Sequence, residues 1–287
     1  MKEILLCTDG SNYSEVCTHY AAWMATRLNW RVSALHVSLL WRYEMPFISD
    51  LGGSLGAQPY QDLISQWQTV ENQKAAVLKK AVTAILEKDG VPHGHISFKH
   101  QTGLLVDSVT EMESKIPNVG LVMLGKRGEN VNFATGHLGS NIERVVRASS
   151  KPCLVTNRRY DEIKKVLFAY DGSAGARKGL DWIGAHADAF KGIDMHIVGA
   201  ADTDAQKKEI DDALEEASTL LKKTGMTLHA KRLDGVAGDV IESYAEAENM
   251  NMMIMGAYGR SRIRQLIIGS TTTELMLRCK IPVLLFR

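Results

Sequence analysis

The sequence lacks the short motifs that mark several classes of nucleotide-dependent enzyme. It has no G-x-x-x-x-G-K-[ST] loop of a P-loop NTPase and no G-x-G-x-x-G fingerprint after its first apolar segment. The Ser-Gly-Gly loop of ATP pyrophosphatases is also absent. These absences argue against a P-loop NTPase and a dinucleotide-dependent enzyme.

Neither sign of charge predominates, and no apolar run is long. Lys and Arg number 34 and Asp and Glu 33, so the formal net charge is +1. This balance argues against a nucleic-acid-binding protein that relies on a basic surface. No apolar run approaches the roughly 20 residues of a membrane span, and the opening MKEILLCTDGS lacks the longer apolar core of a signal peptide. We therefore expect a cytoplasmic protein without a membrane span.

Cysteine is scarce and metal-binding patterns are weak. The chain has four cysteines and no C-x-x-C pair, which favours buried free thiols in a reducing compartment. His93 and His95 resemble a ligand pair, but two ligands do not make a site, so no metal is expected. His36 follows an apolar segment and is interpreted as a packed or hydrogen-bonded histidine.

The sequence repeats itself once, in order. The Asp-Gly-Ser triplet that starts at Asp9 returns at Asp171. The segment LVMLG, which ends at Gly125, corresponds to MMIMG, which ends at Gly256, and KPCLV of the first half corresponds to IPVLL near the end of the second. A duplication predicts two similar domains, residues 1–157 and 162–287, joined by a polar segment near 157–162.

Each half alternates short apolar runs with longer amphipathic stretches, which predicts a parallel sheet with right-handed crossovers. The fold class is α/β, with two tandem five-stranded, doubly wound, Rossmann-like domains. In the second half the strands are expected at 165–170, 195–199, 226–232, 252–255 and 283–286, and the helices at 174–191, 205–224, 236–249 and 271–279.

Ligands of such sheets bind at the carboxyl ends of the strands, where the strand order reverses. The most informative segment there is the glycine-rich run that begins at Gly256 in the second half. Gly256 permits a sharp turn, and Gly259 lets a ribose or phosphate approach the main chain. Gly269 and Ser270 open a helix whose free amide groups favour an anion. The pattern predicts a phosphate site without a Walker lysine.

This arrangement resembles the universal stress protein family, whose nucleotide motif is Gly, two residues, Gly, nine residues, then Gly-Ser or Gly-Thr. Gly256, Gly259, Gly269 and Ser270 match it without a gap, and the early Asp-Gly-Ser and the late Pro-Val match as well. The resemblance covers both halves. It implies a fold similar to the adenine nucleotide alpha hydrolases and a pseudo-dimer in which Leu154–Thr156 and Val283–Phe286 pair or abut.

The resemblance also implies a ligand, ATP or AMP, with Mg²⁺ possible beside ATP. Asp171 would face the nucleotide, main chain just after the second strand would meet adenine, and the glycine motif would hold ribose and phosphates. The implied second-half residues are Asp171, Val198, Gly199, Gly256, Gly259, Arg260, Gly269, Ser270 and Thr271. From the residues alone, both Asp side chains could instead bond their own turn, and Ser270 could be an ordinary helix cap.

The first half departs from the motif, because ten residues rather than nine separate Gly128 from Gly139. This puts its phosphate geometry in doubt. The residues of this weaker site are Asp9, Val37, Gly125, Arg127, Gly128, His137, Gly139, Ser140 and Asn141. An insertion with aromatics and glycines, residues 40–56, is interpreted as a packing patch in preference to a lid.

Three functions stay open at this point. The preferred one is a regulatory stress-response module that binds an adenine nucleotide, with no catalytic residue. The second is a slow ATPase or an autophosphorylating protein that uses Ser270 or Thr271. The third is a nucleotide-free interaction or small-ligand protein. Two chains could also associate into a homodimer.

Overall fold

The computed structural model describes residues 1–38, 58–116, 118–128, 140–257 and 270–287, without the side chains of 58–63, 140 and 270. The first half contains β1 (Glu3–Cys7), α1 (Asn12–Leu28), β2 (Arg31–Ser38), α3 (Gln58–Lys88), β3 (Ile96–Thr102), α4 (Leu105–Lys115), β4 (Val119–Gly125), α5 (Ser140–Ala148) and β5 (Cys153–Thr156). The second half contains β6 (Lys165–Ala169), α6 (Ala174–Ala185), β7 (Asp194–Ala201), α7 (Asp204–Lys222), β8 (Thr227–Asp234), α8 (Ala237–Ala247), β9 (Met252–Gly256), α9 (Ser270–Arg278) and β10 (Val283–Phe286). Single 3₁₀ turns lie at His93–His95 and Ala187–Phe190.

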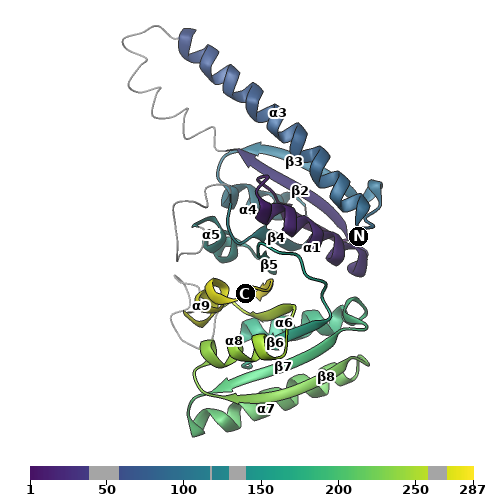
Figure 1. The fold of residues 1–287 in the computed structure, drawn as a ribbon, viewed down its shortest axis with the longest axis vertical. Coiled ribbons are helices and arrows are strands. Elements are labelled where there is room, and N and C mark those ends of the chain that lie inside the picture. The colour runs from purple at the N-terminus through teal and green to yellow at the C-terminus, as the bar shows by residue number, and fades with distance from the viewer. Residues whose placement is uncertain (39–57, 117, 129–139, 258–269) are drawn as a thin grey trace.

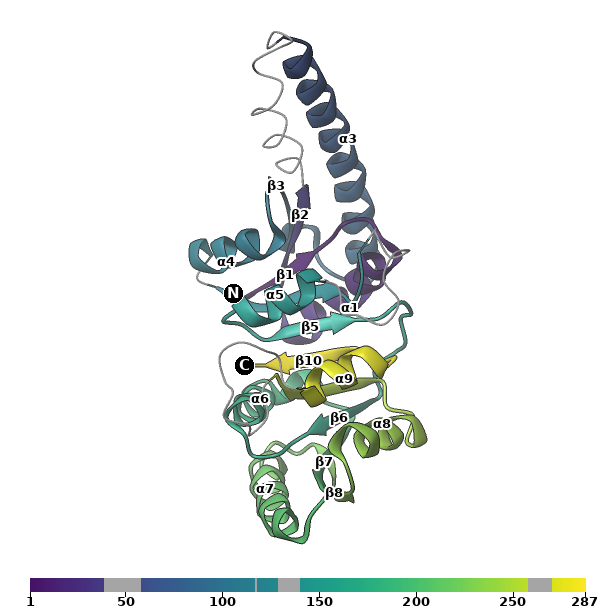
Figure 2. The same ribbon diagram turned by 90° about the vertical axis from the view of Figure 1, so that its left-hand side faces the viewer.

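The strands form one ten-stranded sheet in the order β3-β2-β1-β4-β5-β10-β9-β6-β7-β8. Within each half all pairs are parallel, and the first strand lies between the second and the fourth. At the centre β5 and β10 pair antiparallel, with Leu154 opposite Leu284 (Figure 2). The α/β class and the pairing of these two strands, expected from the family resemblance, are confirmed.

Helices cover both faces of the sheet, and a hydrophobic core fills each side. Residues of α1, α3, α6 and α7 pack in one core, and residues of α4, α5, α8 and α9 pack in the other. Each core contains residues of both halves, because the sheet continues through the junction (Figure 1). The central strands β4 and β9 are almost wholly buried, as strands covered on both faces are expected to be.

Polar contacts join the halves around the β5–β10 pair. The Asn157 side chain donates to the carbonyl oxygens of Cys279 and Ile281, at 3.0 and 2.9 Å. Lys126 Nζ donates to Leu277 O at 2.8 Å, at the end of α9, and burial lowers the pKa of its amine. In the opposite direction, Arg287 donates to the carbonyl oxygen of Arg147 in α5. Side chains of each half thus donate hydrogen bonds to carbonyl groups at or just after the end of a helix in the other half.

The long helix expected at 174–191 is interrupted. Helix α6 ends at Ala185, and a separate 3₁₀ turn follows at 187–190. His186 is the C-cap, with φ −123° and ψ +31°, outside the α-helical region, and its Nδ1 lies 2.8 Å from Trp182 O. Periodicity alone did not reveal this local side-chain contact.

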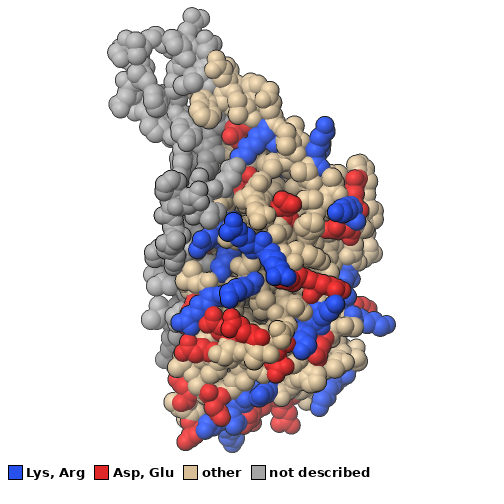
Figure 3. Space-filling view, in the orientation of Figure 1, with Lys and Arg blue, Asp and Glu red and all other residues tan. Residues whose placement is uncertain are grey.

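Helix α3 extends well past the sheet at one end of an elongated molecule (Figure 1). It is 31 residues long, and Trp67, Val70 and Val77 are exposed on it. The insertion at 40–56 lies outside the described residues. Among the described residues, no helix is both long and apolar enough to cross a bilayer. Acidic and basic side chains are interspersed over the face seen in Figure 3.

Candidate functional site

Each half places its two expected ligand-binding segments side by side. Strand β1 pairs with both β2 and β4, and β6 pairs with both β7 and β9. The strand order reverses beside β1 and β6, so the Asp-Gly-Ser turn and the glycine-rich segment leave the same edge of the sheet. An open α/β sheet binds its ligands in this position.

The Asp-Gly-Ser triplets build the same turn twice. In the second half, Asp171 Oδ1 accepts a hydrogen bond from the Ser173 N–H at 2.9 Å, as Asp9 does from Ser11 in the first half. Gly172 has a φ of +73°, which favours glycine. Ser173 is the N-cap of α6, where its hydroxyl accepts from the Ala176 N–H. Both aspartates therefore have a structural role in the turn, whatever else they bind.

In the second half, glycines bring α6 against the ends of β9 and β10. A Cβ on Gly175 would lie 2.7 Å from Phe286 O and 3.4 Å from the Cα of Gly256. The first turn of α9 is fastened to the same point, because Thr272 Oγ1 donates to Gly256 O at 3.2 Å. Gly256, the Asp171 turn and the N-terminus of α9 therefore meet at one edge, and Thr271 is half-buried beside them.

The first half repeats this geometry, but a tyrosine occupies space next to the end of β4. Tyr13 occupies the position of Gly175, and a Cβ on Gly125 would lie 2.7 Å from Tyr13 Cβ. Gly128 approaches the strand-one aspartate so closely that a Cβ there would lie 2.6 Å from Asp9 Oδ2. Gly128 of the motif and Asp9 therefore do come together in this half. Arg127 is half-buried, and Asn141, on α5, is exposed.

Backbone register decides which residues after the second strand reach the ligand edge. The Thr8 N–H donates to Leu35 O and the Tyr170 N–H to Val198 O, so Leu35 and Val198 are equivalent. Val37 in the first half then corresponds to Ala200, and both are half-buried.

The two residues expected to contact adenine in the second half lie deeper than this edge. Val198 is fully buried in the core under α8. A Cβ on Gly199 would meet Ile210 at 2.5 Å, so α7 covers Gly199.

A charged group from α7 lies beside the second Asp-Gly-Ser turn. Tyr170 Oη donates to Glu216 at 3.2 Å, and Arg177 pairs with the same carboxylate at 3.1 Å. Arg177 Nε also donates to Gly172 O at 3.1 Å. Burial, followed by the charge of Glu216, raises the pKa of Tyr170 to about 12. The phenol is therefore neutral near pH 7 and acts as a hydrogen-bond donor.

Several expected residues have no described geometry. Gly259, Arg260, Gly269, His137 and Gly139 lie outside the described residues. Ser270 and Ser140 are the first residues of α9 and α5, but their side chains are not described. Of the expected anion site, the structure therefore describes the starts of α9 and α5 and the two strand ends at Gly256 and Gly125.

The structure also assembles two groups of possible metal ligands that the sequence did not reveal. One is His36, Glu71 and His100, and the other is Asp194, His196 and His229. In each, the two histidines are directly paired on neighbouring strands. Strand register brings each pair of histidines together, so the spacing of histidines along the sequence did not reveal either group. His93, from the pair noted in the sequence, instead contacts Glu87 at 2.5 Å.

Comparison with known proteins gives one consistent result. The profile described as "Universal stress protein family" matches residues 1–157 and again 162–287. Universal stress protein Slr1230 of Synechocystis sp. is 37% identical over 294 residues, with all of both chains covered. A universal stress protein structure from Archaeoglobus fulgidus has a TM-score of 0.70 at 20% identity and covers 100% of this chain and 96% of its own. One from Pseudomonas aeruginosa, described as putative, has a TM-score of 0.62 at 14% identity and covers 100% and 93%.

Proposed function

Because this chain belongs to the universal stress protein family, we propose that it is a stress-response module that binds one adenine nucleotide, ATP or AMP, in its second half. Residues 1–157 and 162–287 are then two domains, of which the second carries the working site. In this proposal the protein acts by binding the nucleotide, and none of its residues is assigned a catalytic role.

One observation carries this proposal. The hydrogen bond from Thr272 to Gly256 O ties the start of α9 to the end of β9, beside the Asp171 turn. An N-terminal helix end offers unpaired N–H groups and a positive dipole to a phosphate. The residues between these two anchors carry the ungapped motif Gly256, Gly259, Gly269 and Ser270. The start of α9 and Gly256, the first residue of the motif, thus lie together at the ligand edge, which supports the proposal.

The register of β7 changes which residue we expect to contact the adenine base. Val198 faces the core and Gly199 is covered by Ile210, so Ala200 is the better candidate for a contact with adenine. The remaining proposed contacts are Asp171 for the ribose and Ser270, Thr271 and Arg260 for phosphates. A Mg²⁺ ion would accompany ATP through its phosphate oxygens.

The first half is a poorer site for the same ligand. Its motif has one additional residue, and Tyr13 stands where the second half has Gly175. We therefore expect one nucleotide per chain, bound in the second half.

A single substitution in the motif tests the site. In Gly259→Val, a branched side chain would stand where ribose or phosphate must approach the main chain. Titration calorimetry with ATP and with AMP should show binding to the unmodified chain and no measurable binding to this variant. Far-UV circular dichroism checks that the variant is folded.

The matched control is Gly184→Val, on an exposed face of α6 where a Cβ meets nothing within 4 Å. It should bind nucleotide as the unmodified chain does. Unchanged affinity in Gly259→Val would contradict the site assignment, and loss of binding in both variants would show that the change in Gly259→Val is not specific to the site.

A further inference from the structure

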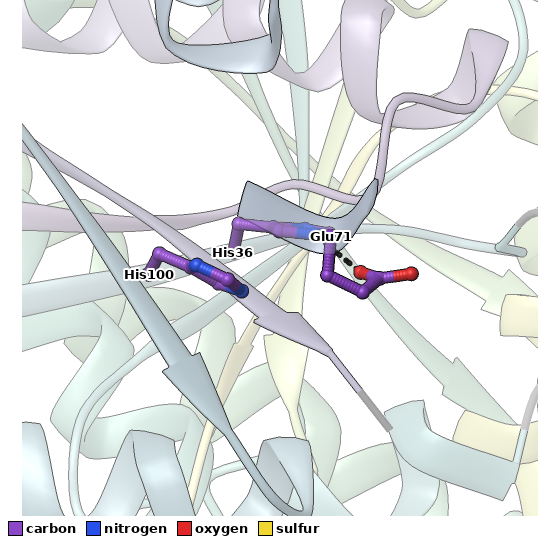
Figure 4. A group of neighbouring side chains, drawn as sticks. All are labelled: His36, Glu71 and His100. Atoms are coloured by element: carbon purple, nitrogen blue, oxygen red, sulfur yellow. Dashed lines mark ion pairs between the residues drawn. The ribbon is translucent and has the colours of Figure 1, made fainter. Parts of the chain in front are cut away.

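Three side chains from three elements of the first half point toward one another. His36 lies on β2, His100 on β3 and Glu71 on α3 (Figure 4). His36 and His100 are directly paired in the strand register, with ring centroids 5.3 Å apart and planes 24° from parallel. Each residue offers one ligand atom, and these atoms all lie within 4.8 Å of one another.

The buried histidine has a defined tautomer. His36 Nδ1 lies 2.9 Å from Thr8 O, a carbonyl that can only accept, so Nδ1 carries the hydrogen and donates it. In the neutral ring Nε2 then holds a lone pair. A histidine that ligates a metal has this arrangement, in which its other ring N–H donates to a carbonyl or carboxylate.

Among the described residues, the same Nε2 atom has no hydrogen-bond partner. The His36 side chain is only 3% exposed, and its Nε2 is buried. Glu71 Oε2 lies 3.9 Å from this Nε2 atom, beyond hydrogen-bonding distance. Buried polar atoms without a partner are rare in folded proteins, so this one calls for an explanation. A cation between the imidazole and the carboxylate would satisfy both.

The spacing suits a transition-metal ion. Ligands at about 2.0–2.1 Å around a tetrahedral Zn²⁺ stand roughly 3.3 Å apart. The 3.9 Å between His36 and Glu71 is already close to this value, and small side-chain movements would close the set. Ser38 Oγ lies 3.2 Å from His100 Nε2 and holds the second ring in place.

We propose that His36, Glu71 and His100 bind one Zn²⁺ ion. Two imidazoles and one carboxylate are a donor set of first-row divalent ions, whereas Mg²⁺ and Ca²⁺ prefer oxygen ligands. Three protein ligands leave a fourth position for water or an external ligand. The proposal is independent of nucleotide binding, because none of the three residues belongs to the glycine motif.

The second group of possible ligands carries no such argument. Asp194 already pairs with both histidines, at 3.3 Å to His196 and 2.9 Å to His229. His196 Nδ1 is 2.8 Å from the hydroxyl of Tyr244, so both its ring nitrogens have partners. The His229 side chain is 53% exposed. These local contacts with Asp194 and Tyr244 account for this group.

The second half also lacks the counterpart of the proposed site. Register places Gly199 and Arg232 where the first half has His36 and His100. A duplicated fold with ligands in only one copy should therefore bind one ion per chain.

The test uses the full chain freed of metal with a chelator and dialysed against Zn²⁺, with bound zinc counted by mass spectrometry. We expect one tightly bound Zn²⁺ per chain. The variants Glu71→Gln and His100→Gln approximately keep the size of the side chain. Loss of a group that only supports a metal ligand weakens zinc binding by roughly 10–100-fold, so the loss of a ligand itself should weaken it by more than this in each variant. The control His229→Gln removes a ligand of the other group and should keep the ion.

A second measurement needs no variant. Co²⁺ in place of Zn²⁺ should give the intense visible absorption of a four- or five-coordinate site, and added Zn²⁺ should abolish it. Absence of stoichiometric Zn²⁺, a six-coordinate Co²⁺ spectrum, or a tightly bound ion that survives Glu71→Gln and His100→Gln would each overturn the proposal. Loss of the ion in His229→Gln alone would assign it to the other group.

Discussion

The pairing of β5 with β10 predicts that the two halves of this protein unfold together. Leu284 is fully buried on β10, opposite Leu154 of the first half. It packs in a core that contains residues of both halves. A cavity made at Leu284 should therefore weaken both halves, although the residue belongs to the second.

The expected loss in Leu284→Ala can be estimated from the burial. Removal of the isopropyl group costs about 2.4 kcal/mol, at about 0.8 kcal/mol for each buried carbon. The cavity left in a rigid core raises the total loss of unfolding free energy to about 3–5 kcal/mol. The same chemical change at Leu220, which is 43% exposed on α7, should cost only about 1 kcal/mol, because part of the side chain is already in water and no enclosed cavity forms.

Urea unfolding measures both the size of the loss and its extent. Far-UV circular dichroism reports the unfolding of the whole chain. Trp182 is the only tryptophan of the second half, so its fluorescence reports the unfolding of that half. The difference between the spectra of the unmodified chain and Trp182→Phe isolates this fluorescence. The two signals should give one coincident transition, shifted to lower urea in Leu284→Ala. Equal losses in Leu284→Ala and Leu220→Ala would refute the burial argument. A separate early transition of the second half alone would refute the shared core.

Two further predictions concern packing and titration. Gly175→Ala should lower the unfolding free energy, measured by urea unfolding, by about 1–3 kcal/mol, because the new Cβ would lie 2.7 Å from the main-chain oxygen of Phe286. The control Gly184→Ala should not lower it, because a Cβ there has nothing within 4 Å. Equal losses in the two variants would contradict this account. Burial raises the pKa of Cys17 and of Cys153 to about 12, from an ordinary 9.0. In the folded chain these thiols should resist an aromatic disulfide reagent at pH 8, and the unfolding free energy should fall as pH rises past about 9, because only the unfolded thiols ionise there. Rapid reaction without denaturant, or a free energy of unfolding that stays constant above pH 9, would show that they are not buried.

Much of the fold could be predicted because the duplication and the apolar runs are strong signals. The segments ending at Gly125 and Gly256 are central strands, as their uncharged sequences indicate. The β5–β10 pairing was available only through the family resemblance, since nothing in two buried four-residue segments specifies an antiparallel partner. Helix α6 ends at Ala185, where the backbone of His186 leaves the helical region, and helical periodicity does not contain this local conformation.

Some parts of the candidate site could be predicted from the sequence, and others could not. The Asp-Gly-Ser turns follow directly from local chemistry, with Asp171 bonding the main chain and Ser173 capping a helix. The proposal of Ala200 in place of Val198 rests on the register of β7 against β6, which sequence spacing resolves only to a residue or two. His36, Glu71 and His100 come from distant parts of the chain, so only the folded sheet and helix bring them together.

The central claim is that the second half holds one adenine nucleotide. The most direct measurement is to purify the protein without added nucleotide, denature it, and identify and count the adenine nucleotide released per chain. We predict close to one ATP or AMP per chain, and none from Gly259→Val. No released nucleotide, followed by no uptake when ATP is added, would contradict the account and favour a protein that acts through other ligands or partners.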